Sequence, residues 1–339
     1  MTTATTQSAL LEEAQVTRRI FELISPELQL VEEEFERQAR SNIQVIAYIG
    51  EYLRRSGGKR VRPALTILSN YAVGGDGSDR SSIRMATVME FLHTATLVHD
   101  DVIDKAETRR NRPSVNSEFG NQTAVLMGDW LYMSAFETSL AERSLPILDI
   151  LTSVTRKMTE GELLQLTMLG RTDISEDQYL DVIARKTAYL FSACCEIGAL
   201  LGGADSARQV QLREYGMNLG TAFQLVDDLL DFTGDEETLG KPAGADLIEG
   251  KVSLPLIFLL QRQPELRGDI QTIIADESYA TVSRGRILEQ LQQTGALEHA
   301  KELAIEYAEA AVASLNGFNH SPYARALAAI PAYIVERDR

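Results

Sequence analysis

Cysteine is scarce in this sequence, which contains only Cys194 and Cys195. The two residues are adjacent and lie in an apolar stretch, so their spacing gives no disulfide framework and no metal-binding pattern. Such sparse usage is typical of a reducing compartment, and we expect a cytoplasmic protein. We expect both cysteines to be small buried core residues.

Positive charge is also in short supply. The chain has 33 Lys and Arg residues against 49 Asp and Glu residues, which gives a formal net charge of -16. This balance argues against nucleic-acid binding, because that function needs a basic surface. We therefore expect the functional basic residues in local clusters that bind an anionic ligand.

Long apolar runs and alternating strand patterns are both absent from the sequence. No run reaches the roughly 20 apolar residues that span a bilayer. The N-terminus has no basic segment followed by an apolar core, so no signal peptide is expected. Apolar residues instead recur every three or four positions, which predicts an all-α fold. The predicted helical segments cover residues 8–55, 61–73, 81–104, 121–143, 147–169, 176–202, 206–232 and 254–316.

Three carboxylates end the apolar segment FLHTATLVHDDVID. Asp100 and Asp104 are four residues apart, so on a helix they share one face, roughly 6 Å apart along the axis. Asp101 points elsewhere on the same turn. Like charges at this spacing repel each other, and a cation would compensate them. Oxygen ligands without a Cys or His pattern favour magnesium. A single acidic pair of this kind is more often a solvated helix face.

The same acidic spacing recurs in FQLVDDLLDF, where Asp227, Asp228 and Asp231 again close an apolar helical run. One such cluster is weak evidence for a metal site, but the repetition strengthens it. We interpret the two clusters as two poles of one site that clamps a diphosphate through magnesium.

A basic segment precedes the first cluster along the chain. Lys59, Arg60 and Arg62 follow two glycines and precede Pro63, which is expected to open the next helix. Three cations at a helix start oppose the helix dipole, and a bound anion would relieve this. A solvated basic turn is the alternative interpretation.

Other basic residues are also expected to bind an anionic ligand. Arg109 and Arg110 come just after the first acidic cluster, in an expected polar loop, where their planar guanidinium groups suit phosphate oxygens. Lys186 lies in an apolar segment and must either reach solvent or meet an anion. The long loop after the second cluster carries Lys241 and Lys251, and long structured loops are often functional.

The ordered motifs GGKRVRP, DDVID followed by RR, KT, FQLVDDLLDF and GKPAGADLIEGK resemble those of the trans-polyprenyl diphosphate synthases. The resemblance implies a single all-α domain over residues 1–339, built as a helical bundle around a central cavity. It implies that the acidic clusters face each other across the mouth of this cavity, and that the protein is a homodimer. The implied activity is magnesium-assisted, head-to-tail condensation of isopentenyl diphosphate with an allylic diphosphate. The product is expected to be longer than farnesyl diphosphate.

The resemblance also assigns roles, with three magnesium ions expected when substrate is bound. The expected metal ligands are Asp100, Asp104, Asp227 and Asp231, with Asp101 and Asp228 supporting them directly or through water. The expected allylic diphosphate contacts are Arg109, Lys186 and Lys241. The expected isopentenyl diphosphate contacts are Lys59, Arg62, His93 and Arg110, and Arg60 and Lys251 join the substrate-binding set. Thr187 and Gln224 are expected beside the carbocation, and His99 is expected to be structural.

Product length is expected to depend on the residues one helical turn before Asp100. These are Ala95 and Thr96, which are both small, whereas short-chain relatives commonly carry aromatic residues there. The path for the growing chain is therefore expected to be open, with a medium-to-long product. Asn111 replaces a glycine that is frequent after the arginine pair, and asparagine tolerates left-handed backbone angles.

Three other interpretations stay open at this stage. A class I terpene cyclase also ionises a diphosphate with magnesium, but it needs no isopentenyl diphosphate site. A regulatory partner of a heteromeric synthase typically lacks the acidic clusters. An all-helical scaffold leaves the placement of the cationic loops unexplained. We expect no transmembrane segment, although release of a prenyl product allows transient membrane contact.

Overall fold

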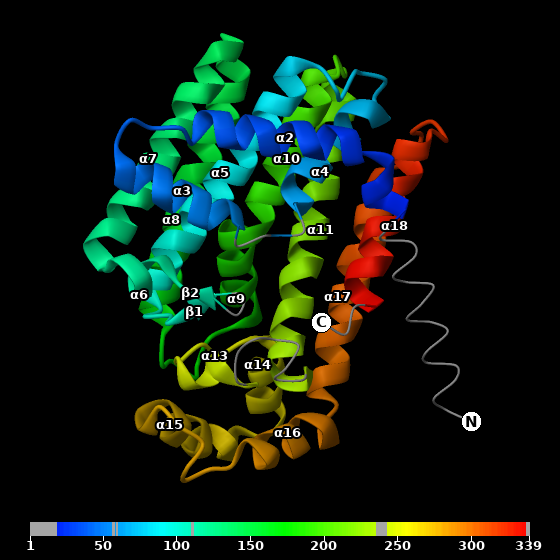
Figure 1. The fold of residues 1–339 in the computed structure, drawn as a ribbon. Coiled ribbons are helices and arrows are strands. Elements are labelled where there is room, and N and C mark those ends of the chain that lie inside the picture. Colours follow the sequence, from blue (N-terminus) through cyan, green and yellow to red (C-terminus); the bar gives the residue numbers. More distant parts are fainter. Residues whose placement is uncertain (1–18, 56–57, 59, 110–111, 235–242, 337–339) are drawn as a thin grey trace. The chain divides into compact units, whose positions relative to one another are not determined.

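The computed structural model describes residues 19–55, 58, 60–109, 112–234 and 243–336. Within these residues the chain is almost entirely helical, and the strands form one small antiparallel hairpin (Figure 1). The predicted all-α fold class is therefore confirmed. Lys59, Arg110, Asn111 and Lys241 lie outside the described residues.

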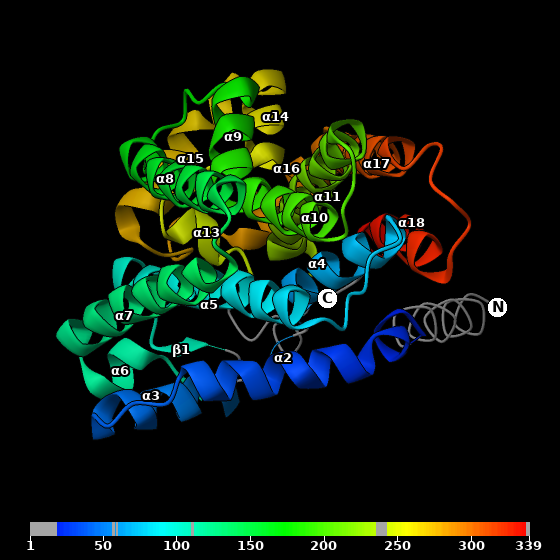
Figure 2. The same cartoon turned by 90° about the horizontal axis from the view of Figure 1, so that it is seen from above.

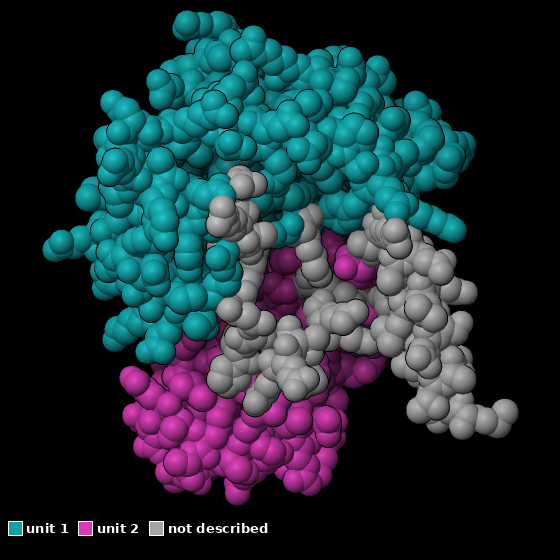
Figure 3. Space-filling model, viewed as in Figure 1, with its two compact units in different colours: residues 1–155, 190–216, 314–330 teal, residues 156–189, 217–313, 331–339 magenta. Residues whose placement is uncertain are grey.

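The chain divides into two compact units (Figure 3). Unit 1 comprises residues 1–155, 190–216 and 314–330, and unit 2 comprises residues 156–189, 217–313 and 331–339. That the whole chain forms a single domain around a central cavity stays a prediction.

Unit 1 is built around α5 (Arg80–Ile103), which packs against α2, α4 and α7 (Figure 2). Asp79 caps the start of α5, because its side chain accepts a hydrogen bond from the backbone N–H of Ser82 at 2.6 Å. The middle of α5 is fully buried, and the Phe91 ring stacks on Phe35 of α2 at 4.4 Å between centroids. This packing holds the acidic end of α5 in place. The other elements that lie in unit 1 are α2 (Ser25–Gln38), α3 (Gln44–Arg55), α4 (Val61–Ala72), β1 (Thr108–Arg109), β2 (Arg112–Pro113), α6 (Val115–Phe119), α7 (Asn121–Ser139) and the 3-10 turn η1 (Leu140–Glu142).

Helix α4 begins at Val61, the first residue of the predicted segment 61–73, and not at Pro63, which was expected to open it. Arg60, the residue before the helix, adopts a left-handed conformation with φ 49°. Helix α2 begins at Ser25, and no side chain caps it.

Unit 2 holds the second acidic cluster. The segment 254–316 is helical as predicted, and it is divided into several helices, with a turn after Arg262 and another after Asp276. The elements of this unit are α9 (Glu176–Ile183), the π-helical turn η2 (Ala184–Ala188), α13 (Ala245–Ile248), α14 (Leu254–Arg262), η3 (Pro264–Leu266), α15 (Arg267–Asp276), α16 (Arg284–Gln293) and nearly all of α17 (Ala296–Ser314). The other helices with residues in both units are α8 (Leu145–Met168), α10 (Tyr189–Leu201), α11 (Ser206–Thr233) and α18 (Pro322–Glu336).

Both cysteines lie in the core, as predicted. Cys194 and Cys195 on α10 are fully buried and form no disulfide. Burial raises the pKa of the Cys194 thiol to about 12, so it stays protonated near neutral pH. Among the described residues, no helix is both long and apolar enough to cross a membrane.

Candidate active site

The first acidic cluster lies at the C-terminal end of α5. Asp100 and Asp101 occupy the last helical turn, and Asp104 is the C-cap residue. Carboxylates at this end of a helix oppose the helix dipole, so the arrangement is electrostatically unfavourable without a cation. Asp100 and Asp104 are half-buried, whereas Asp101 is buried. Burial raises the pKa of Asp101 above its usual value, and the neighbouring Asp100 and Asp104 add to this rise.

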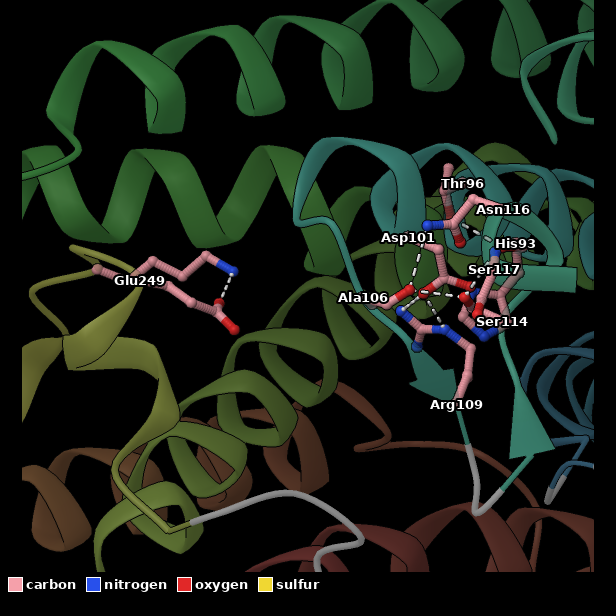
Figure 4. A network of polar contacts seen from close by, with 10 residues as sticks. His93, Thr96, Asp101, Ala106, Arg109, Ser114, Asn116, Ser117 and Glu249 are labelled. Atoms are coloured by element: carbon pink, nitrogen blue, oxygen red, sulfur yellow. Dashed lines mark hydrogen bonds and ion pairs between the residues drawn. The ribbon is translucent and has the colours of Figure 1, made fainter. Parts of the chain in front are cut away.

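Arg109 provides a cation for this cluster. Its Nε and Nη2 lie 2.7 and 2.6 Å from Oδ1 of Asp101, so both nitrogens contact a single carboxylate oxygen (Figure 4). The guanidinium group lowers the pKa of Asp101, which partly offsets the effect of burial. The expected arginine and the first cluster are therefore brought together.

The expected polar loop forms a small hairpin. Thr108 pairs with Pro113, and Arg109 pairs with Arg112 in antiparallel register. The hairpin is closed at its base by the side chains of Ser114 and Asn116, which donate hydrogen bonds to the carbonyl oxygen of Ala106 at 2.6 and 3.1 Å (Figure 4).

The basic segment at the start of α4 has two described arginines with different surroundings. Arg60 is held by two carboxylates: its Nε and Nη2 bind Glu32 of α2, and its Nη1 donates to Glu90 of α5 at 2.6 Å. The Cζ atom of Arg62 lies 4.9 Å from the centroid of the Phe191 ring. Arg60 thus ties the segment to two helices, and its contact with substrate stays a prediction.

Other predicted residues lie further back on α5. His93 is half-buried, and its carbonyl oxygen accepts a hydrogen bond from Thr96 Oγ1 at 2.8 Å. Ala95 is fully buried. His99 packs against Gly128 of α7, where an added Cβ would lie 2.2 Å from the ring Nε2. Its Nε2 lies 3.1 Å from the carbonyl oxygen of Val125, which agrees with a structural role.

A crevice in unit 1 lies between the basic segment and the hairpin. Its volume is about 40 Å³, and its lining includes Tyr52, Arg60, Glu90, Asp101 and Arg109. This volume holds a few water molecules.

The second acidic cluster lies near the end of α11 in unit 2. Asp228 is buried, and both of its carboxylate oxygens accept hydrogen bonds: Oδ1 from Nε2 of Gln224 at 2.8 Å and Oδ2 from the hydroxyl of Tyr179 at 2.7 Å. Oε1 of Gln224 accepts a bond from Thr187 Oγ1 at 2.7 Å. The predicted residues Thr187, Gln224 and Asp228 therefore form one hydrogen-bonded chain.

The two other aspartates of the cluster differ in exposure. Asp227 is exposed, whereas Asp231 is buried. The carbonyl oxygen of Asp231 accepts a bond from Gly244 N at 2.6 Å, and its Oδ2 lies 3.3 Å from Asp246 N at the start of α13. Gly244 has φ 78°, and an added Cβ would lie 2.5 Å from the Tyr279 hydroxyl, so this turn requires glycine. The contacts fix Asp246 beside the cluster.

The predicted lysines of unit 2 pair with glutamates. Lys186 lies in the π-helical turn η2, and its Nζ is 2.9 Å from Oε1 of Glu162 on α8. Lys251 Nζ is 2.7 Å from Oε2 of Glu249. Single π-helical turns within helices are often found at functional sites.

The donor chemistry of both clusters suits a hard divalent cation. Burial raises the pKa of Asp228 to about 7, and the neighbouring Asp246 and Asp227 carboxylates add to the rise. A magnesium ion would offset this crowding, and all the ligands are oxygens. Among the described residues, no three His, Cys, Asp or Glu side chains form a ready-made metal site. Magnesium usually binds through one or two carboxylates together with substrate phosphates, so the residues fit this ion.

Comparison with known proteins identifies the family. The model of the polyprenyl synthetase family matches residues 43–291. The chain belongs to the polyprenyl synthetase family. The octaprenyl diphosphate synthase of Escherichia coli (strain K12) is 38% identical over 322 residues, which cover 95% of this chain and 99% of the relative. The all-trans-nonaprenyl-diphosphate synthase (geranyl-diphosphate specific) of Rhodobacter capsulatus is 38% identical over 298 residues, which cover 88% and 90%.

A solved structure agrees with these relatives. The polyprenyl synthase from Caulobacter crescentus CB15, complexed with calcium and isoprenyl diphosphate, superimposes with a TM-score of 0.90 at 36% identity. The match covers 95% of this chain and 98% of the other. Membership of the polyprenyl synthetase family confirms the predicted enzyme class, a prenyltransferase that makes polyprenyl diphosphates.

Several contact residues were not predicted from the sequence. Tyr179 and Glu162 lie in ordinary helical segments, and nothing in their local pattern distinguishes them. Glu32 and Glu90, which hold Arg60, lie in predicted helical segments and were given no role. Asp246 could have been found from the sequence, because it is a carboxylate within a long glycine-rich loop.

Proposed function

We propose that this polyprenyl synthetase family member condenses isopentenyl diphosphate with an allylic diphosphate, and that three magnesium ions assist the reaction. The observation that carries the proposal is the acidic end of α5, where Arg109 is already fixed against Asp101 by two contacts. Carboxylates for metal and a guanidinium group for phosphate there occupy adjacent positions, as diphosphate binding requires.

The proposed metal ligands are Asp100 and Asp104 of unit 1 and Asp227 and Asp231 of unit 2. Asp228 and Asp101 act as supports, since each already accepts hydrogen bonds from protein donors. Magnesium, when bound, neutralises the negative charge that develops on the departing diphosphate.

The remaining residues bind and orient the substrates. We assign Arg109, Lys186 and Lys241 to the allylic diphosphate, and Lys59, Arg62, His93 and Arg110 to isopentenyl diphosphate. Lys186 is held beside Glu162, so its ammonium group is positioned in advance. Thr187 and Gln224 present oriented dipoles that stabilise positive charge on the allylic carbon.

Proton removal in this reaction needs no activated side chain. The double bond of isopentenyl diphosphate attacks the allylic cation, which forms the new carbon–carbon bond and leaves a cation on the condensed chain. The released diphosphate then removes a proton from this cation, and a new double bond forms. The protein has to exclude water, which would otherwise quench the cation.

Three further properties belong to the proposal. The small side chains of Ala95 and Thr96 leave room for a growing chain, which favours a medium-to-long product. The enzyme acts as a homodimer in the cytoplasm. Its contact with membrane is transient and serves release of the apolar product.

A product assay tests the proposed function. The purified enzyme is incubated with isopentenyl diphosphate and, in turn, dimethylallyl, geranyl or farnesyl diphosphate, with magnesium or with a chelator. The dephosphorylated products are separated by chromatography. Linear prenyl alcohols longer than farnesol, formed only with magnesium, are the expected result. Cyclic hydrocarbons, or no elongation with any primer, would contradict the proposal.

A further inference from the structure

Tyr52 of α3 connects a helix with the hairpin that carries Arg109. Its hydroxyl donates a hydrogen bond to the carbonyl oxygen of Pro113 at 2.6 Å, although the two residues are 61 positions apart in the sequence. The Tyr52 ring also packs edge-on against Phe119 of α6, with ring centroids 5.6 Å apart. The tyrosine therefore contacts both the second strand of the hairpin and the helix that follows it.

The ring of Tyr52 supports the hairpin from a second side. The Cζ atom of Arg112 lies 5.0 Å from the ring centroid, which is a cation–π distance. Arg112 is the cross-strand partner of Arg109, the residue whose guanidinium group contacts Asp101. Tyr52 thus holds the strand directly opposite Arg109 through its hydroxyl and through its ring.

The hydrogen bonds within the hairpin do not hold it against α3. Ser114 and Asn116 bind the carbonyl oxygen of Ala106, which closes the hairpin upon itself. These bonds leave its direction relative to α3 undefined, whereas the Tyr52–Pro113 bond fixes it. The Tyr52 hydroxyl is protonated at neutral pH and can donate, and burial raises its pKa further above the usual value.

We propose that Tyr52 is a positioning residue, whose hydroxyl holds the β1–β2 hairpin so that Arg109 is oriented to receive the diphosphate of the allylic substrate. This inference rests on the proposed function and adds a residue from outside the recognised motifs. Helix α3 ends at Arg55, shortly before the basic segment that begins at Lys59, so the same helix links two phosphate-binding elements.

The test is the Tyr52→Phe variant, which removes the hydroxyl and keeps the ring against Phe119 and Arg112. A hydrogen bond of about 0.5–1.5 kcal/mol sets the upper limit for the rise in the KM for the allylic diphosphate, roughly twofold to twelvefold. We expect kcat to stay close to that of the wild type, and the melting temperature to fall by no more than the loss of this single exposed bond allows. The matched control is Tyr48→Phe on the same helix, whose exposed ring lies 5.8 Å from Phe119.

The outcomes separate this inference from the proposed function. Binding of farnesyl diphosphate with magnesium, without isopentenyl diphosphate, is measured by calorimetry for both variants and the wild type. Wild-type enzyme that neither binds nor elongates the diphosphate would contradict the proposed function. Active wild type with unchanged KM and Kd in Tyr52→Phe would overturn the role of Tyr52. So would a parallel loss of kcat, affinity and melting temperature, which indicates a general structural role.

Discussion

Tyr179 donates a hydrogen bond to Oδ2 of Asp228 at 2.7 Å, and both side chains are buried. Because Oδ1 of Asp228 accepts from Gln224, the carboxylate cannot rotate without breaking a bond. The tyrosine therefore fixes the central carboxylate of the second acidic cluster, although it lies in no recognised motif. This relationship gives the first prediction.

Replacing Tyr179 by Phe should destabilise the protein and reduce turnover. A buried carboxylate oxygen loses its donor, which costs about 1–3 kcal/mol in the free energy of unfolding. We expect kcat/KM to fall, because Asp228 and its neighbour Gln224 are less firmly oriented. Urea unfolding and the steady-state assay measure the two effects. Tyr307→Phe on α17 is the control, and an equal effect of both variants would refute the specific role of Tyr179.

Replacing Asp100 or Asp227 by Ala should remove most of the activity while the fold survives. Loss of a group that stabilises transition-state charge costs roughly a hundredfold to a thousandfold in kcat. If both clusters serve one ionisation step, the double variant should be little worse than the poorer single variant. Circular dichroism checks the fold, and the exposed Asp149→Ala is the control. Full activity in either single variant would exclude the metal assignment.

Replacing Glu90 by Gln should loosen the basic segment. Arg60 loses one of its two anionic partners while its left-handed backbone conformation remains, and the free energy of unfolding should fall by about 1–3 kcal/mol. The KM for isopentenyl diphosphate should rise, because Arg62 lies two residues further on. Glu36→Gln, an exposed position of α2, should change neither quantity. Unaltered stability and KM in Glu90→Gln would show that Glu32 alone holds the segment.

Replacing Ala95 by Phe should shorten the product. The residue is fully buried one turn before Asp100, and a phenyl ring there occupies space that the growing chain is expected to use. Added core volume also costs about 1–3 kcal/mol, so melting temperature is measured beside the product distribution. Ala95→Ser is the small-volume control. An unchanged product from a folded Ala95→Phe enzyme would contradict the tunnel interpretation.

The sequence predicted the features that depend on local spacing. Three- and four-residue periodicity located α5 and α11, and acidic spacing located Asp100, Asp104 and Asp227 at helix ends. The predicted segment 81–104 agrees with α5 (Arg80–Ile103) to within one residue at each end. Its capping residue and its apolar spacing are both local features of the sequence.

Contacts between distant residues could not be predicted in this way. Arg60 was assigned to substrate because its neighbours are basic, yet the carboxylates that hold it come from positions 28 and 30 residues away. The hairpin was expected as a loop, because strands of two residues carry no alternating pattern. That the two acidic clusters face each other stays a prediction.

The pairing of Arg109 with Asp101 has a consequence for how an anion arrives. An arginine that waits in solvent must give up rotational freedom when it meets its ligand. Here that freedom is already restricted by the contact with Asp101. If Arg109 binds the allylic diphosphate as proposed, its guanidinium group exchanges one anionic partner for another, and it can pair with Asp101 again once the diphosphate has left.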